Sequence, residues 1–522
     1  MKDRLPPAFP ICPTSRRTFL RETSRGAATA VAAPVLLSRL GAAITNPTAS
    51  GASTGAGDNP LFMSATKLAG LIRARKISSV EVVRLCLERI EQVNPRIHAV
   101  VTVCRERALA EAAEADAALA GGRSVGALHG VPMTMADVLD TAGIVSTGGT
   151  PGQREHVPAG DATVVARLRA AGAILLGKSN TSELGLDDGP ATTNPVFGPT
   201  RNPFDPVRVP GGPAGGAGAI VAAGGAAFDI GSGTDGALRR AAAANGIAGL
   251  KATCGLLPRT GHILNRGALY DSLLQLGPLA RRVEDLALLL PILAGPDDQD
   301  AMVVPVPLGD HAAVALKNLR VAFYTQPGSG LPRVSSEIAE LVKRCASHFA
   351  ELGCRVVEEA PPRMAELFAK TRIARGAAGG ADLRRLFQAH GANAEPLLPE
   401  TQGPEIPSPD YTLALLEMDA LKSEQLAWVE HFDLLVGPAS AGVPPRADRV
   451  SSDPGSAGHG ADLDPYAING WPAGVVRAGS SREALGLPLG VQVAGQPWHD
   501  HEVLAALAFL EERTGGWQPP AL

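Results

Sequence analysis

Apolar residues recur with helical spacing in the stretch that begins at residue 78. Residues 78–81, SSVE, have the form of a capping box, and the apolar positions of 83–90 then fall on one face of a helix. This helix should end before Asn94-Pro95, because proline lacks the N–H that a helix interior needs. A second helix is predicted over 104–120, where alanine, glutamate and leucine dominate and a glycine pair follows.

Short apolar runs alternate with helical patterns further along the chain. Residues 163–171 have a helical pattern, and a run typical of a buried strand follows over 173–177. Residues 433–438 and 490–495 have the composition of core strands that return to the same sheet. This alternation predicts a layered α/β fold, and no repeat or change in composition divides it, so we expect a single domain over 61–522.

The first 45 residues have the pattern of an export signal. The paired arginines Arg16 and Arg17 precede Phe19-Leu20, and a mildly apolar, alanine-rich stretch covers 26–43. This arrangement resembles a twin-arginine signal, and its apolar stretch is too short and too weakly hydrophobic for a membrane-spanning helix. The alternative is a basic amphipathic helix on the protein surface.

The residues between this signal and the folded domain are small and polar. Cleavage is expected after Ala42-Ala43, which assigns residues 1–45 to the signal peptide. Residues 46–60, NPTASGASTGAGDNP, have the composition of a disordered linker. We therefore expect a periplasmic or secreted protein, with no stable membrane span once the signal is removed.

Composition narrows the classes of partner. The 522 residues are 45% hydrophobic and 19% charged, and basic and acidic residues are interleaved with a net charge of −4. Such a balance does not favour binding to nucleic acid or to an anionic membrane, so we expect small-molecule partners. The six cysteines form no C-x-x-C pair and have no histidine at ligand spacing, which argues against a zinc site or a redox dithiol. We expect no cofactor and no metal.

Several separate motifs recur in a fixed order, and together they resemble the amidase-signature family. The motifs are Gly130-Val131-Pro132, residues 194–203 (NPVFGPTRNP), the glycine pairs Gly211-Gly212 and Gly215-Gly216, and Gly249-Leu250-Lys251. Their order and spacing agree with the family over about residues 63–510, and this agreement is far more specific than one glycine-rich run. The resemblance implies a mixed central β-sheet with helices on both faces.

The same resemblance implies amide hydrolysis or transfer by a serine nucleophile, a second serine on a cis peptide and a lysine. A serine hydroxyl is a poor nucleophile at neutral pH until a base removes its proton, so this chemistry needs all three residues. In this chain the lysine falls on Ala136, the relay serine on Pro213 and the nucleophile on Ala237. An aspartate that the family carries just upstream falls on Gly233. We expect Gly212-Pro213 to keep the family's cis geometry, because proline makes a cis bond inexpensive.

Other parts of the family's site survive in the glycine-rich turn. In the family, backbone N–H groups before the nucleophile form the oxyanion hole, and Thr234, Asp235, Gly236 and Ala237 keep theirs. Arg239 keeps its family position and could pair with Asp235 or hold an anion. These five residues are the predicted binding site for a small amide or carboxylate. The alternative is a turn whose glycines serve close packing alone.

Three functional hypotheses follow. The first is a pseudoenzyme that binds an amide, carboxylate or peptide without cleaving it. The second is an active amidohydrolase that uses displaced residues such as Ser232 or Thr234, with Lys178, which precedes Ser179, as a further residue that could take a catalytic role. The third is a structural component that works through contact with a partner chain.

Overall fold

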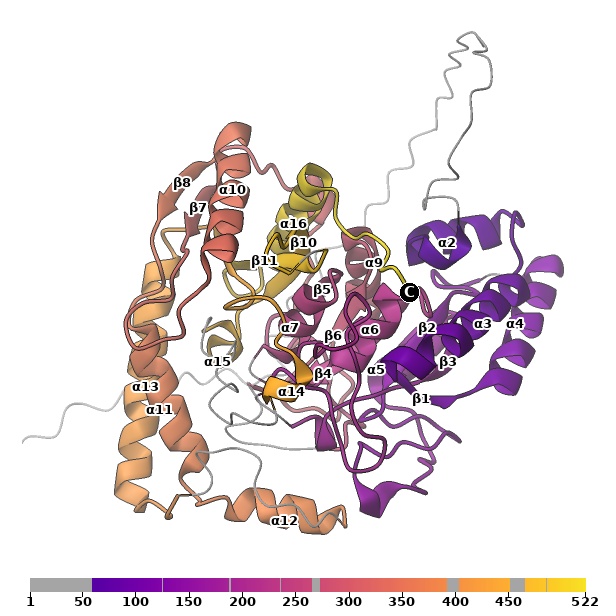
Figure 1. Cartoon of the computed structure of the whole chain (residues 1–522), viewed down its shortest axis with the longest axis horizontal. Helices are drawn as coiled ribbons and strands as arrows, with labels where there is room; N and C mark the ends of the chain where they lie inside the picture. Colours follow the sequence, from indigo (N-terminus) through magenta and orange to yellow (C-terminus); the bar gives the residue numbers. More distant parts are fainter. Residues whose placement is uncertain are drawn as a thin grey trace, which may run out of the picture. The chain divides into compact units, whose positions relative to one another are not determined.

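A single mixed sheet of eleven strands forms the centre of the structure (Figure 1). The computed structural model describes residues 59–123, 125–186, 189–234, 236–264, 273–391, 403–450, 465–484 and 486–522. The strand order is β1-β3-β2-β4-β6-β5-β10-β11-β9-β7-β8. The bounds are β1 Val100–Val103, β2 Pro132–Ala136, β3 Ile174–Ser179, β4 Phe228–Gly233, β5 Ala248–Lys251, β6 Gln275–Ala280, β7 Arg320–Phe323, β8 Arg355–Glu358, β9 Leu434–Pro438, β10 Ala473–Ser480 and β11 Pro488–Gly495.

Antiparallel pairs form the centre of this sheet, and parallel pairs lie toward both of its edges. The pairs β2 with β3, β2 with β4, β7 with β8 and β7 with β9 are parallel, and the remaining pairs are antiparallel. Parallel strands need crossover connections, which the helices between them supply. The predicted strands over 173–177, 433–438 and 490–495 are confirmed as β3, β9 and β11.

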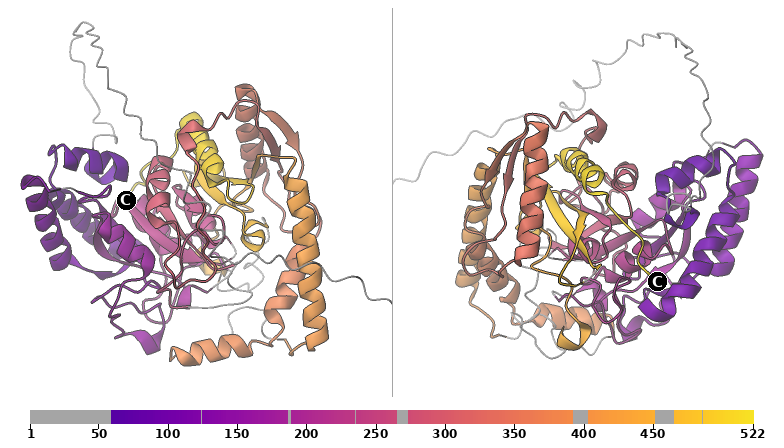
Figure 2. Two further views of the ribbon diagram at one scale, coloured as in Figure 1. Left: turned by 180° about the vertical axis from the view of Figure 1, so that it is seen from behind. Right: turned by 45° about the horizontal axis from the view of Figure 1, so that its top comes forward.

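Helices connect and cover the strands. The α-helices are α2 Ala65–Arg73, α3 Ser79–Ile97, α4 Arg105–Ala120, α5 Thr163–Ala170, α6 Gly215–Ala222, α7 Ala237–Ala244, α9 Val283–Leu293, α10 Ser336–Leu352, α11 Met364–Gly376, α12 Ala381–Ala389, α13 Ser408–Val429, α14 Ala447–Val450, α15 Tyr466–Asn469 and α16 Asp500–Thr514. The short 3₁₀ helices are η2 Pro60–Phe62, η3 Pro151–Gln153, η4 Glu183–Gly185 and η5 His311–Ala313. The orange pair α11 and α13 packs side by side (Figure 2).

Two glycines show that helices cover both faces of the sheet. A Cβ placed on Gly249 of β5 would lie 2.8 Å from the Cβ of Ala242 in α7. A Cβ placed on Gly474 of β10 would meet Leu507 of α16. Gly474 pairs with Leu250, the neighbour of Gly249, and adjacent residues in a strand point to opposite faces. The helices α7 and α16 therefore pack on opposite faces, and the predicted α/β fold with a flanked mixed sheet is confirmed.

The first predicted helix begins where its capping box indicates but ends later than expected. Ser78 Oγ accepts a hydrogen bond from the Glu81 N–H at 3.0 Å. The helix continues through Pro95 to Ile97, so the expected end before Asn94 is wrong. Pro95 stands within this last turn, and the Asn94 side chain fixes the backbone that follows by accepting, among others, a hydrogen bond from the Ala99 N–H at 2.8 Å.

The predicted helices over 104–120 and 163–171 are confirmed as α4 and α5. Among the residues that the structure describes, no helix is both long enough and apolar enough to cross a bilayer. The predicted signal over 1–45 and nearly all of the predicted linker over 46–60 lie outside the described residues.

Candidate functional site

The sheet brings to one edge the three positions to which the family resemblance assigns catalysis. Ala136 is the last residue of β2, and Ala237 is the first residue of α7, which follows β4. Because β2 and β4 are parallel neighbours, their carboxyl ends lie at the same edge of the sheet. Pro213 stands just before α6, in the connection that leads into β4. All three side chains are buried and carry neither an ionisable nor a nucleophilic atom.

Gly233, the last residue of β4, is the point at which two of these positions meet. A Cβ added to Gly233 would clash with the Cβ of Ala237 and would lie 3.8 Å from the Cβ of Pro213. The Ala237 methyl group therefore occupies the space that a side chain at 233 would need. An aspartate at 233, as in the family, could not be accommodated here without a shift of α7.

The Gly212-Pro213 bond differs from the expectation. The structure contains no cis peptide bond among its described residues, so the predicted cis geometry is wrong. The chain turns instead at Gly212, whose φ of 103° lies in a region that favours glycine. The Gly212 N–H donates to Pro190 O at 2.7 Å, and the Gly215 N–H donates to Gly212 O at 2.8 Å. Thr192 Oγ1 also donates to Gly212 O, so three contacts hold this turn.

The glycine-rich turn after β4 closes on itself. The Ala237 N–H donates to Thr234 O at 3.1 Å, and Gly236 adopts a φ of 84°. The Ala237 N–H, which the family resemblance assigns to the oxyanion hole, therefore donates to a carbonyl of the same turn. Arg239 is 1% exposed, so its side chain lies within the protein. Asp235 lies outside the described residues, and a pairing with Arg239 stays a prediction.

Ser232 points away from the family site. The Cβ positions of Gly231 and Gly233 face Ala214 and Ala237, on the side of α6 and α7. Because side chains alternate along a strand, Ser232 faces the other side of the sheet. There its Oγ lies 2.6 Å from His262 Nε2.

The hydrogen bonds of His262 fix its role toward Ser232. His262 Nδ1 accepts a hydrogen bond from the Leu264 N–H at 3.0 Å, so in the neutral ring the proton is on Nε2. His262 therefore donates to Ser232 Oγ and does not accept its proton. Burial, with a smaller contribution from Arg259, lowers the pKa of His262 to about 3, which keeps the ring neutral.

Lys178, near the carboxyl end of β3, belongs to a buried polar cluster with residues that follow β2. Its ammonium donates to Thr141 Oγ1 at 2.9 Å, to Ser146 Oγ at 3.3 Å and to Leu139 O. Burial lowers the pKa of Lys178, and the nearby carboxylates, first among them that of Asp137, oppose this shift. The sequence made Lys178 a candidate for a displaced catalytic role, but it did not reveal the cluster around it. The sequence pattern that could have predicted this cluster is the set of polar residues at the carboxyl ends of β2 and β3.

The start of the last helix, α16, is held by a buried carboxylate. His499 holds the N-cap position, and the Asp500 carboxylate accepts hydrogen bonds from the N–H and hydroxyl of Thr253. His499 is 3.1 Å from Glu502 and stacks on His501. The described residues contain no cluster of three or more side chains suited to a metal ion.

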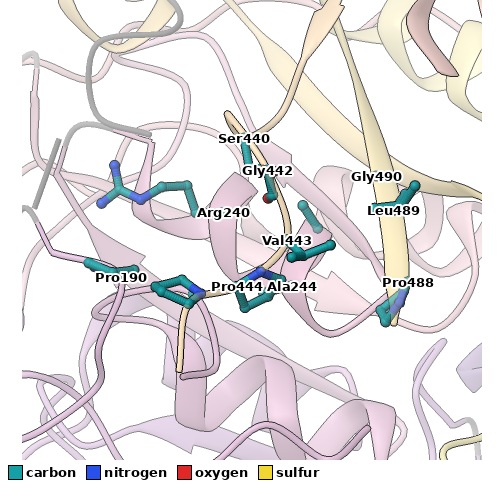
Figure 3. Close-up of a pocket in the computed structure, with 13 residues that line it drawn as sticks. Pro190, Arg240, Ala244, Ser440, Gly442, Val443, Pro444, Pro488, Leu489 and Gly490 are labelled. Carbon is teal, nitrogen blue, oxygen red and sulfur yellow. Dashed lines mark hydrogen bonds between the residues drawn. The ribbon is translucent and has the colours of Figure 1, made fainter. Parts of the chain in front are cut away.

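A small proline-lined cavity lies at the far end of α7 (Figure 3). Its walls include Pro190, Arg240, Val443, Pro444, Pro488 and Leu489. About 40 Å³ is free for water, which is room for roughly three molecules. None of the three family catalytic positions lines this cavity, and it is too small for an amide substrate as it stands.

Comparisons with known proteins agree with this geometry. The Amidase family model matches residues 81–504. The chain belongs to the amidase family. It is 34% identical over 489 residues to a glutamyl-tRNA(Gln) amidotransferase subunit of Moorella thermoacetica, covering 87% of this chain and 97% of that one. It is 36% identical over 490 residues to the corresponding subunit of Acidothermus cellulolyticus, covering 87% and 95%.

Solved amidase structures have the same fold. The structure of 6-aminohexanoate cyclic dimer hydrolase matches with a TM-score of 0.78 at 25% identity and covers 88% of this chain and 99% of that chain. The peptide amidase of Stenotrophomonas maltophilia matches with a TM-score of 0.73 at 28% identity and covers 88% and 98%. The family and fold that the motifs indicated are therefore confirmed.

Proposed function

We propose that this member of the amidase family does not hydrolyse amides at the family's catalytic positions and acts by binding instead. One observation carries the proposal: Ala136, Pro213 and Ala237 stand where the family has its lysine, relay serine and nucleophile. Two methyl groups and a pyrrolidine ring can neither attack a carbonyl nor transfer a proton. When such residues are lost, the rate enhancement that remains comes mainly from substrate binding and from backbone hydrogen-bond donors.

The contacts of Ser232 weigh against a displaced active site. Ser232 faces away from Pro213 and Ala237, and its hydroxyl accepts a hydrogen bond from a histidine that has no free acceptor for a proton. A nucleophile needs an adjacent base in order to be activated at neutral pH. Thr234 is 3% exposed, which restricts access of a substrate to its hydroxyl.

The binding role that we propose is for a small amide or carboxylate, because the turn that carries the family's oxyanion donors is kept in sequence. The backbone N–H groups of Thr234 and Gly236 and the Arg239 side chain remain its candidate contacts, and the Ala237 N–H would become available only if its bond to Thr234 O opened. A ligand that binds there would stabilise the folded protein in proportion to the logarithm of its concentration above Kd.

The test is a hydrolysis assay on the purified full chain. The substrates should include linear primary amides, peptide amides, cyclic amides and esters, with product release compared with a buffer blank. We expect no release above the blank. Turnover in the wild-type protein that disappears in Ser232→Ala or Thr234→Ala would instead establish the displaced site.

A second candidate role is that of one component in a larger assembly. The relatives that are 34% and 36% identical are each named as a subunit of an amidotransferase, which favours this possibility for a chain of the same fold. Light scattering on the purified chain and native mass measurement of the protein isolated from its own host would detect a stable partner. A monomer in both measurements would rule out a stable assembly.

The location of the protein is also a proposal. We infer export from the paired Arg16 and Arg17 and the alanine-rich stretch that follows them. A binding protein outside the cytoplasm would meet ligands from the surroundings of the cell.

A further inference from the structure

A groove much larger than the proline-lined cavity lies between two loop segments, 191–201 and 206–209, and the start of α14. About 660 Å³ is free inside it, which is within the usual range for small-molecule sites. We call it the Arg201–Arg446 groove. The residues that matter most to its chemistry are Thr192, Thr200, Arg201, Val207, Val209 and Arg446.

Backbone hydrogen bonds hold both sides of the groove. On one side the Thr200 N–H donates to Thr192 O at 2.9 Å, which ties the two parts of that loop together. On the other side the Ala447 N–H donates to Val207 O at 2.9 Å and the Val209 N–H donates to Pro445 O at 3.1 Å. These walls are thus fixed before any ligand arrives, which lowers the entropic cost of binding.

Arg201 gives the groove a positive charge that no acidic residue in the described part of the chain neutralises. Its backbone N–H is anchored to Ile97 O at 2.8 Å. Its guanidinium makes no hydrogen bond or ion pair with any other residue that the structure describes. The side chain is half-buried, so it is held near the groove.

Arg446 provides the second guanidinium. Its contacts with Asp448 are long, at 3.3 and 3.4 Å from Nε, and both side chains are exposed. Such exposed pairs contribute little and are readily exchanged for a better partner. Asp448 is the acidic residue of the groove wall, so two arginines face one exposed carboxylate.

Most of the remaining wall is apolar, and Thr193 is its exposed polar residue. Pro199, Pro206 and Val207 offer rigid hydrocarbon surface, and Val207 is 45% exposed, whereas Val209 is buried. The hydroxyls of Thr192 and Thr200 are already committed, since each donates to a backbone carbonyl. The groove therefore combines a guanidinium end with an apolar surface.

We propose that the Arg201–Arg446 groove binds an organic carboxylate with a compact apolar body. A carboxylate accepts two hydrogen bonds from one guanidinium in a matching planar geometry, and it can displace the weak contact of Asp448 with Arg446. The apolar body packs on the proline and valine wall. This inference stands whether or not the chain hydrolyses amides, because the groove contains none of the three family catalytic positions.

Matched ligand pairs test the proposal. Calorimetric titration of the full chain should use N-acetyl-L-phenylalanine, N-acetyl-L-leucine, hexanoate and benzoate, each beside its uncharged primary amide, with inorganic phosphate as a further probe. We expect at least one carboxylate to bind, with its amide at least about tenfold weaker, because the amide loses the charge-assisted bonds. We expect phosphate to bind more weakly than that carboxylate, because phosphate has no apolar body.

Variants locate the binding. Arg201→Gln should weaken carboxylate binding at least about tenfold. Val207→Trp should weaken it by filling the groove without removal of a charge. Arg84→Gln, a change of an exposed arginine on α3, is the matched control and should bind as the wild type does. Melting curves without ligand verify that each variant is folded.

Several results would overturn the proposal. If none of the four carboxylates binds, or if a folded Arg201→Gln and a folded Val207→Trp both bind like the wild type, the groove is not the site. Equal binding of a carboxylate and its amide would exclude recognition of charge. Phosphate binding as tight as that of the carboxylate would exclude the apolar contribution.

Discussion

Ser232 Oγ lies 2.6 Å from His262 Nε2, and the histidine is the donor in this hydrogen bond. A serine beside a histidine would suggest nucleophilic catalysis if the distance alone were considered. The Leu264 N–H excludes this role, because it donates a hydrogen bond to His262 Nδ1. The proton of the neutral ring is therefore on Nε2, which cannot accept the serine proton. The pair is therefore a buried structural contact between β4 and the segment that follows β5.

The first prediction concerns this contact. Ser232→Ala should leave the His262 Nε2–H without its acceptor and destabilise the protein by about 1–3 kcal/mol, the usual cost of an unsatisfied buried donor. Amide hydrolysis should stay at the level of the blank in both proteins. Urea unfolding measures the stability, and Ser347→Ala, on the exposed side of α10, is the control. Unchanged stability in Ser232→Ala would contradict the donor assignment.

The second prediction concerns pH. Burial raises the pKa of Asp229 to about 6, although the Thr134 hydroxyl and Lys178 oppose the shift. Between the unfolded pKa of about 4 and the folded pKa the native state binds more protons than the unfolded state, so this group lowers stability as pH rises.

Asp229→Asn removes that titration. Relative to the wild type, the variant should gain stability between pH 4 and 6.5, by up to about 3 kcal/mol for a shift of roughly two units. Denaturant unfolding of both proteins at several pH values measures the difference. A difference that is constant with pH would show that Asp229 does not titrate in this range.

The third prediction concerns export. Replacement of Arg16 and Arg17 by lysine should abolish accumulation of the protein outside the cytoplasm, because twin-arginine export depends on the arginine pair. Fractionation of cells followed by immunoblotting measures the location. Arg4→Lys, outside the paired motif, is the control. Unchanged accumulation in the double variant would leave the amphipathic helix as the better interpretation of residues 15–43.

The fold could be predicted because motifs and periodicity agree over most of the chain. The strands β9 and β11 were predicted from short apolar runs, and the family resemblance supplied the mixed sheet. The end of α3 could not be predicted, because proline commonly stops a helix, whereas here Pro95 stands within the last turn before the left-handed C-cap His98.

The internal contacts of the candidate site could not be predicted from the motifs. Motif spacing predicts that Ala237 and Pro213 lie close together. In the structure a Cβ added to Gly233 would lie within 4 Å of the Cβ atoms of both residues. Motifs do not specify which partner an amide has, so the bond between the Ala237 N–H and Thr234 O was missed. The Arg201–Arg446 groove was missed as well, since its two arginines are far apart in the sequence and line one groove through the pairing of 206–209 with 445–447.

The last prediction concerns restoration of the family's residues. The triple variant Ala136→Lys, Pro213→Ser and Ala237→Ser should remain without measurable hydrolysis of the same amide and ester panel. The nucleophile would be restored, but the Ala237 amide would still donate to Thr234 O and would not be available to a developing oxyanion. Loss of one such donor costs about 10²- to 10³-fold in rate. Gly233 also provides no carboxylate to the turn. The side chain at 237 fills the space that a side chain at 233 would need. The control is the single variant Ala237→Ser, whose melting temperature should stay close to that of the wild type. Hydrolysis by a folded triple variant would show that this turn opens to admit a substrate, and the preserved scaffold would then be an amidase that lacks nothing but its three side chains.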